Sequence, residues 1–160
     1  MLLATQIQEL RRLSHELSCL CVSNETPFYA DRFRQLHTEI MEKADALLTM
    51  KGTTDEEEAF LCLALLSGYE AALFNQSGNE AKKQIVLDRS WNVLDHLPAS
   101  LLKCQLLVSC YAEVFDEELA REAHTIMERW NQQALSQEQI EVMAMLKVLE
   151  ENPYPWREIE

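Results

Sequence analysis

Residues 54–74 read TDEEEAFLCLALLSGYEAALF, and this stretch indicates a helical fold most directly. Thr54 can cap the free amides at the start of a helix, and Glu57 can complete a capping box. The four consecutive acids favour the positive end of the helix dipole. The apolar residues that follow surround the helix axis and do not keep to one stripe. We therefore predict a helix from Thr54 to about Phe74 that is buried on more than one side.

Apolar residues recur at helical spacing on both sides of this stretch, which predicts six further helices. We expect them at about residues 3–21, 27–51, 80–97, 99–115, 117–130 and 137–150. Asp116 is predicted to cap the helix of 117–130, and Ser136 with Gln139 the last helix. The side chains expected to face inward include Phe60, Ile85 and, on the last helix, Ile140, Met143, Ala144, Leu146 and Leu149.

A weak internal repeat runs through the middle of the chain. Gly68-Tyr69 is matched 42 residues later by Cys110-Tyr111, and Trp91 is matched 39 residues later by Trp130. A small residue and an aromatic on one helix, followed by a second helix, resemble the helix hairpin of tetratricopeptide repeats. We predict an all-α fold of about seven helices in antiparallel hairpins that form a right-handed stack of this kind. A compact helical bundle is the alternative, because either arrangement covers the apolar face of each hairpin.

The length and composition favour one helical domain. The chain has 160 residues, of which 48% are hydrophobic, and only 3 glycines and 4 prolines interrupt it. A chain of this length can bury a normal core as a single unit. We therefore predict one domain over residues 1–160, with an extended C-terminal tail at 152–160 because Pro153 and Pro155 prevent a helix there.

The net charge of −13, from 27 acids against 14 bases, limits the partners that the chain can bind. Nucleic acids and anionic membranes would repel it, since both are bound through concentrated Lys and Arg. A basic protein partner is compatible with this charge, although acidity can also serve solubility alone. The N-terminus lacks the pattern of a signal peptide, and the longest apolar run, residues 59–66, is too short to cross a membrane. We expect a cytoplasmic protein.

The sequence contains no recognisable catalytic or metal-binding motif. The four histidines fall on different predicted helices, and the cysteines show no C-x-x-C spacing. Glycine-rich phosphate loops and nucleophile elbows are also absent from the sequence. We predict neither enzymatic activity nor a cofactor or metal site, and we expect the cysteines to be buried reduced thiols. The histidines are His15, His37, His96 and His124, and the cysteines are Cys19, Cys21, Cys62, Cys104 and Cys110.

Three stretches resemble the UpxZ family of capsule-locus regulators. They are VLDRSWNVLDHLPASLLKCQLL at 86–107, CYAEVFDEELA at 110–120 and ENPYPW at 151–156, and the similarity extends over the whole chain. The resemblance implies an antagonist of bacterial transcription antitermination. Members are encoded in capsular polysaccharide operons beside a NusG-like antitermination factor, and they inhibit the non-cognate factors of other capsule loci. The implied partner is therefore a NusG-like protein, bound without direct contact to nucleic acid.

The resemblance assigns no binding residues, so we select candidates from the residues themselves. Acids gather where the helix of 99–115 meets the next, and aromatic side chains stand in the tail, where they either bind a partner or fold back on the last helix. The candidates are Glu113, Asp116, Glu117, Glu118, Tyr154 and Trp156.

Two other functions remain open. One is a helical-repeat scaffold for an unrelated protein or peptide, and the other is a small enzyme or metal-dependent bundle. The oligomeric state is left open.

Overall fold

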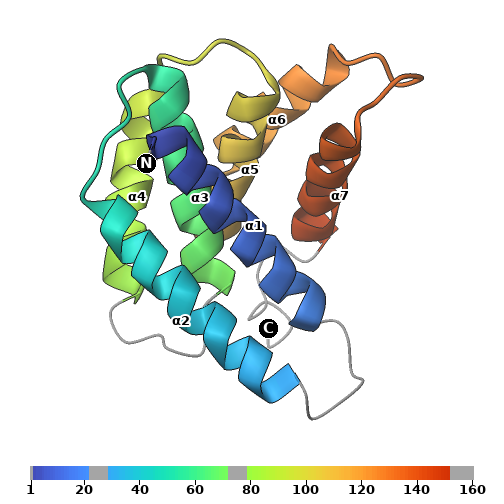
Figure 1. Ribbon diagram of the computed structural model, residues 1–160. Helices are drawn as coiled ribbons and strands as arrows, with labels where there is room; N and C mark the ends of the chain where they lie inside the picture. Colours follow the sequence, from blue (N-terminus) through green and yellow to red (C-terminus); the bar gives the residue numbers. More distant parts are fainter. Residues whose placement is uncertain (1, 22–28, 72–78, 152–160) are drawn as a thin grey trace, which may run out of the picture. The chain divides into compact units, whose positions relative to one another are not determined.

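The computed structural model describes residues 2–21, 29–71 and 79–151, and these residues form seven helices with no strand among them (Figure 1). The predicted all-α fold of about seven helices is therefore confirmed. In chain order the helices are α1 (Leu3–Cys21), α2 (Tyr29–Leu48), α3 (Asp55–Ala71), α4 (Asn79–Leu94), α5 (Leu101–Val114), α6 (Glu117–Glu128) and α7 (Gln137–Glu151). None of the described helices is both long and apolar enough to span a membrane.

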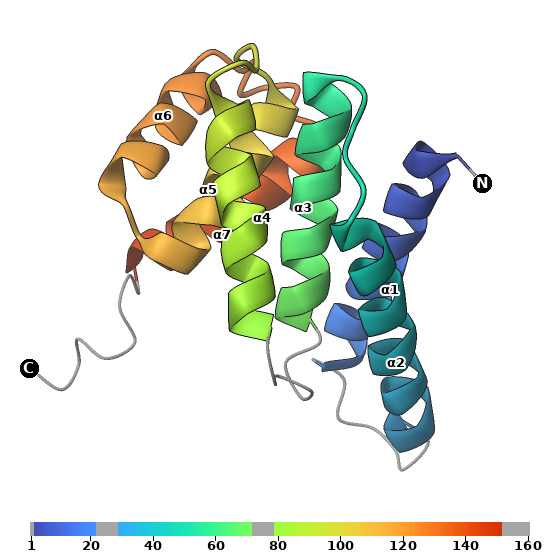
Figure 2. The ribbon, with the colours of Figure 1, turned by 90° about the vertical axis from the view of Figure 1, so that its left-hand side faces the viewer.

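The chain divides into two compact units, residues 1–93 and 94–160. In the first unit α1, α2 and α3 pack against one another, and α1 and α2 form an antiparallel hairpin (Figures 1 and 2). In the second unit α5 packs against both α6 and α7. The single domain over residues 1–160 and the right-handed stacking of the hairpins stay predictions. The predicted tail at 152–160 lies outside the described residues.

Leucine and isoleucine side chains from three helices make the core of the first unit. Gly68 on α3 permits their close packing, since a Cβ there would lie 3.2 Å from Leu10 Cδ1 and 3.5 Å from Ile40 Cγ2. The buried Tyr69 beside it donates a hydrogen bond of 2.8 Å to Asp45 on α2. Fully buried members of this core are Leu10, Leu13, Leu17, Leu36, Ile40, Leu61 and Leu65.

Ion pairs attach α4 to the rest of the first unit. Arg89 pairs with Glu58 on α3, and Lys83 lies 2.6 Å from Glu70 on the same helix. Lys82 approaches Asp45 on α2 at 2.9 Å. Helices α3 and α4 lie side by side and antiparallel in Figure 2. The buried side of α4 is therefore partly polar. The spacing of the apolar residues in α4 does not by itself show which side of the helix is buried.

Two predictions of inward-facing residues in this unit were wrong. Ile85 on α4 is 49% exposed, because Val86 and Val93 occupy the buried face in its place. Phe60 on α3 is also partly exposed, and the guanidinium of Arg11 lies 6.0 Å from its ring. A helix with apolar residues on several sides does not show which side faces the core.

The predicted capping residues of the helices are confirmed in three places. Thr54 Oγ1 accepts from the Glu57 amide at 3.1 Å, and Ser136 Oγ accepts from the Gln139 amide at 3.1 Å. Asp116 Oδ1 accepts from the Glu118 amide at 3.0 Å. The start of α5 was predicted too early, because Ser100 is its cap and the helix begins at Leu101. These contacts are local in sequence, which is why the pattern shows them.

Candidate partner-binding surface

The turn between α5 and α6 is only two residues long and places a phenylalanine in a left-handed backbone conformation. Phe115 has φ 52° and ψ 37°, and its amide donates to the Tyr111 carbonyl at 2.8 Å. That conformation costs a residue with a side chain about 1–2 kcal/mol. The rings of Phe115 and Tyr111 meet edge to face with centroids 5.3 Å apart, a contact that offsets part of this cost. The turn is thus tightly defined.

Four of the six predicted binding residues flank this turn. Glu117 and Glu118 form the exposed first turn of α6, and Asp116 caps it. Glu113 stands half-buried near the end of α5. Glu118 pairs with Arg121 at 3.0 Å, but both side chains are well exposed, so water screens this contact. We call Glu113, Asp116, Glu117 and Glu118 the acidic turn.

The remaining two predicted residues, Tyr154 and Trp156, lie outside the described residues. Their assignment as partner contacts stays a prediction, and so does the alternative that they fold back on the last helix. The acidic turn likewise stays a predicted contact surface. Its four residues lie near one another because they are close in the sequence.

The second unit carries a strong excess of negative charge. Residues 94–151 contain eleven acids and four bases. Lys103, one of the four bases, is largely buried and pairs with Glu122 at 2.6 Å. Arg121 is engaged by Glu118. The acidic turn therefore belongs to a broadly electronegative unit, which favours encounter with positively charged partners.

Helix α7 exposes much of its apolar surface, contrary to the predicted orientation. Val142 and Leu146 are its buried residues. Ile140, at 46% exposed, and Ala144 were predicted to face inward but face solvent. Met143 and Leu149 are only partly buried. The prediction was wrong because α7 is apolar on more than one side, and the side that packs on α5 depends on the tertiary fold.

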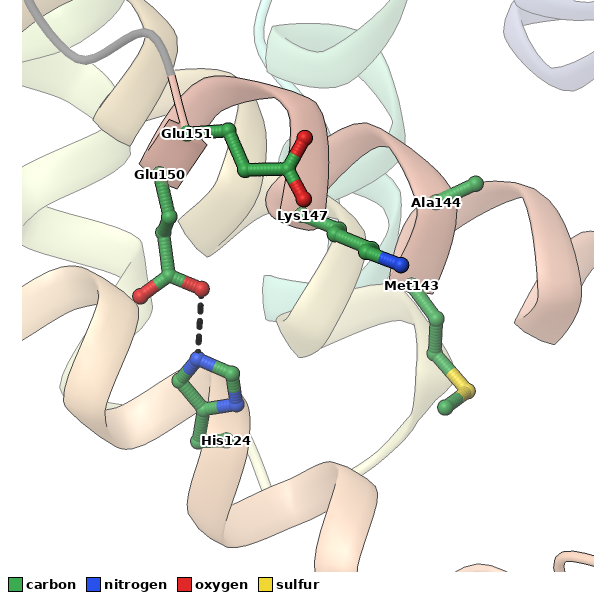
Figure 3. Close-up of a pocket in the computed structure, with 6 residues that line it drawn as sticks. All are labelled: His124, Met143, Ala144, Lys147, Glu150 and Glu151. Carbon is green, nitrogen blue, oxygen red and sulfur yellow. Dashed lines mark hydrogen bonds and ion pairs between the residues drawn. The ribbon is translucent and has the colours of Figure 1, made fainter.

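A groove of about 470 Å³, which the sequence did not predict, lies between α6 and α7. Met143 and Lys147 line it from α7 (Figure 3). Glu150 reaches across from α7 to His124 on α6, where its Oε1 lies 2.7 Å from Nε2 of the imidazole ring. Both side chains are exposed to solvent, so this contact contributes little to the stability of the fold.

Cys62, Cys104 and His37 are buried in the helical core. Burial raises the pKa of the Cys62 thiol to about 11 and that of Cys104 to about 12, so both are protonated at neutral pH. His37 is buried against the Phe33 ring at a centroid distance of 4.4 Å, and burial lowers its pKa. Among the described residues, no three His, Cys, Asp or Glu side chains are grouped so as to hold a metal ion.

Exposed acids at the start of α6 and exposed apolar residues on α7 characterise an all-α protein suited to recognising other proteins. A model of the UpxZ family of transcription anti-terminator antagonists matches residues 7–112. The crystal structure of a transcription anti-terminator antagonist UpxZ from Bacteroides uniformis is 43% identical, with 100% of this chain and 99% of that chain covered and a TM-score of 0.88. No curated protein matches the chain. The chain therefore belongs to the UpxZ family of transcription anti-terminator antagonists.

Family membership confirms the resemblance inferred from the sequence and assigns the chain a regulatory role with protein partners. This role is not an enzymatic one. The family model ends at residue 112, just before the acidic turn and helices α6 and α7. The acidic turn therefore stays a prediction from geometry and charge, and the groove is described from geometry alone.

Proposed function

We propose that this chain acts in the cytoplasm by binding NusG-like antitermination factors of other capsular polysaccharide loci and inhibiting them, without catalysing a reaction. The observation that carries the proposal is membership of the UpxZ family. The net charge of −13 supports a basic protein as the target and disfavours nucleic acid. NusG-like factors present basic elements toward polymerase and nucleic acid, so an acidic protein that covers them would block their action.

We further propose that the acidic turn contacts the factor, together with Tyr154 and Trp156. The carboxylates of Glu117 and Glu118 are exposed to solvent on the first turn of α6. Exposed charges of this kind guide the encounter of two proteins and set its salt dependence. Aromatic side chains would add the apolar contact that holds the complex together.

The proposal is tested with purified factors from the cognate and several other capsule loci. We expect the chain to capture non-cognate factors and to reduce transcription readthrough promoted by them, while its cognate factor is spared. Equal capture of all factors would contradict the selectivity, and capture of none would contradict the function.

Charge reversal tests the acidic turn separately. Glu117→Lys with Glu118→Lys should weaken binding of a non-cognate factor by about 10-fold at low salt and flatten its salt dependence. Asp55→Lys with Glu56→Lys is the matched control, because these two acids occupy the exposed first turn of α3 and the change in net charge is the same. If both double variants lose affinity equally, net charge and not the acidic turn is responsible.

A further inference from the structure

We propose that the exposed apolar strip of α7, with the groove beside it, binds a basic amphipathic helix of the partner protein. The strip consists of Ile140, Ala144, Met145 and Val148. The inference rests on the proposed function in one respect, since the helix is taken to belong to the antitermination factor. The surface itself is distinct from the acidic turn.

The strip is a continuous line along the outside of α7. Ile140, Ala144 and Val148 follow one another at intervals of four residues, which places them on the same side of the helix over about 12 Å. Val148 is 59% exposed, and Met145 also faces solvent. Val142 and Leu146 on the opposite side already bury the face that packs on α5. Helix α7 thus has one apolar face for the fold and a second that the described residues leave uncovered.

The groove between α6 and α7 extends this apolar surface. Met143 and Lys147 line it next to the strip, and Ala144 contributes to both. In Figure 3 the side chains of Met143 and Ala144 leave α7 in different directions, and both line the groove, so the groove adjoins the strip at Ala144. A partner helix whose apolar face lies along α7 would contact the strip and the adjoining side of the groove, as amphipathic helices do when they bind an apolar groove.

The charges around the strip select a basic partner. Glu138, Glu141 and Glu151 are exposed on α7 beside the apolar residues, and Lys147 is the one base on this helix. A helix with Lys or Arg on each side of an apolar stripe would place opposite charges at this rim. A second copy of the chain would bring the same acids face to face across a symmetric interface, which is unfavourable.

The test removes the apolar contact without changing the charge. Ile140→Gln with Val148→Gln replaces two exposed apolar side chains by a residue that favours helices. Ile85→Gln on α4 is the matched control, since Ile85 is 49% exposed and belongs to the other unit. Two probes are titrated in solution: a non-cognate antitermination factor, and a synthetic amphipathic helix made of leucine and lysine. A leucine and glutamate peptide serves as the reversed-charge control.

We expect the double variant to lose about 10-fold or more in affinity for both probes, while Ile85→Gln stays within about two-fold of the original chain. The glutamate peptide should not bind. Equal affinity of the double variant and the original chain for the lysine peptide would overturn the inference. If the original chain binds the lysine peptide at this strip but no factor, the proposed function fails and the surface assignment stands.

Two other occupants of the strip are separated by the same variants. If the original chain is a dimer in sedimentation and the double variant is a monomer, the strip is covered by a second copy and the inference is wrong. If the melting temperature of the double variant falls by several degrees while its affinity is unchanged, the strip is covered by another part of this chain, which also overturns it. An unchanged melting temperature with lost affinity supports the inference.

Discussion

Arg89 on α4 and Glu58 on α3 form two parallel hydrogen bonds, each of 2.8 Å, between the guanidinium and the carboxylate. The same guanidinium also donates to the carbonyls of Leu48 at 3.0 Å and Met50 at 2.7 Å, where α2 ends. Glu58 in turn accepts from the Gly52 amide at 2.9 Å. Three helices of the first unit are therefore joined through one ion pair.

Replacing Arg89 by Met should destabilise the first unit strongly. The side chains of Arg89 and Glu58 are only 13% and 17% exposed, so the substitution leaves a carboxylate and two carbonyls poorly solvated. We expect a loss of about 2–4 kcal/mol in the free energy of unfolding, measured by urea denaturation. Arg12→Met, which removes an exposed pair with Glu9, is the control and should leave stability unchanged. Similar losses in both variants would contradict this assignment.

The same pair should make stability depend on pH in the acid range. Burial alone would raise the pKa of Glu58, but hydrogen bonds from Arg89 and the Gly52 amide outweigh it and hold the pKa below 4.5. Since the folded pKa lies below the unfolded value, the contribution is complete above about pH 4.5 and is lost as the pH falls through the folded pKa. The difference in unfolding free energy between the original chain and Arg89→Met should therefore shrink below about pH 4.5. A difference that stays constant down to pH 3 would refute this.

Two substitutions at Phe115 separate backbone strain from ring packing. Phe115→Ala keeps a side chain in the left-handed conformation and loses the contact with Tyr111, whereas Phe115→Gly loses the same contact and relieves the strain. We expect the glycine variant to be more stable than the alanine variant by about 1 kcal/mol in thermal or urea unfolding. An alanine variant as stable as the glycine variant would show that the turn adopts another backbone conformation in solution.

Cys62 and Cys104 should resist alkylation in the native protein. With pKa values of about 11 and about 12, only about one thiol in 10³ and one in 10⁴, respectively, is ionised at pH 8. Iodoacetamide pulses followed by peptide mass mapping should leave both unmodified in buffer and modify both in urea. Rapid labelling of either residue in buffer would mean that the surrounding helices open readily.

Features set by neighbouring residues in the sequence were predicted well. The caps formed by Thr54, Asp116 and Ser136 depend on contacts within three residues, and the acidic turn is compact because its members adjoin in the chain. The family was also identified correctly, because long stretches of the sequence carry the resemblance.

Features that depend on which helices meet were not predicted. On α4, Lys83 and Ser90 are buried, and their polar groups are hydrogen-bonded to Glu70 and to the Val86 carbonyl. Because these buried residues are polar, the sequence does not reveal that this side of α4 faces the core. On α7, apolar residues lie all round the helix, and only the packing on α5 distinguishes Leu146 from Ile140. The groove between α6 and α7 depends on the same packing, and periodicity within one helix cannot reveal it.

The sparse anchoring of α7 has a consequence for its motion. Of its fifteen residues, Val142 and Leu146 are buried, whereas seven of the fourteen residues of α5 are buried in the same unit. Helices held by few buried contacts detach locally at a lower free energy than the global unfolding of the protein. The amides of α7 should thus exchange with solvent deuterium faster than those of α5, and a ligand seated on α7 would slow that exchange by trapping the docked form. Binding of the ligand would then be coupled to the docking of α7, and the free energy of that docking would contribute to the measured affinity.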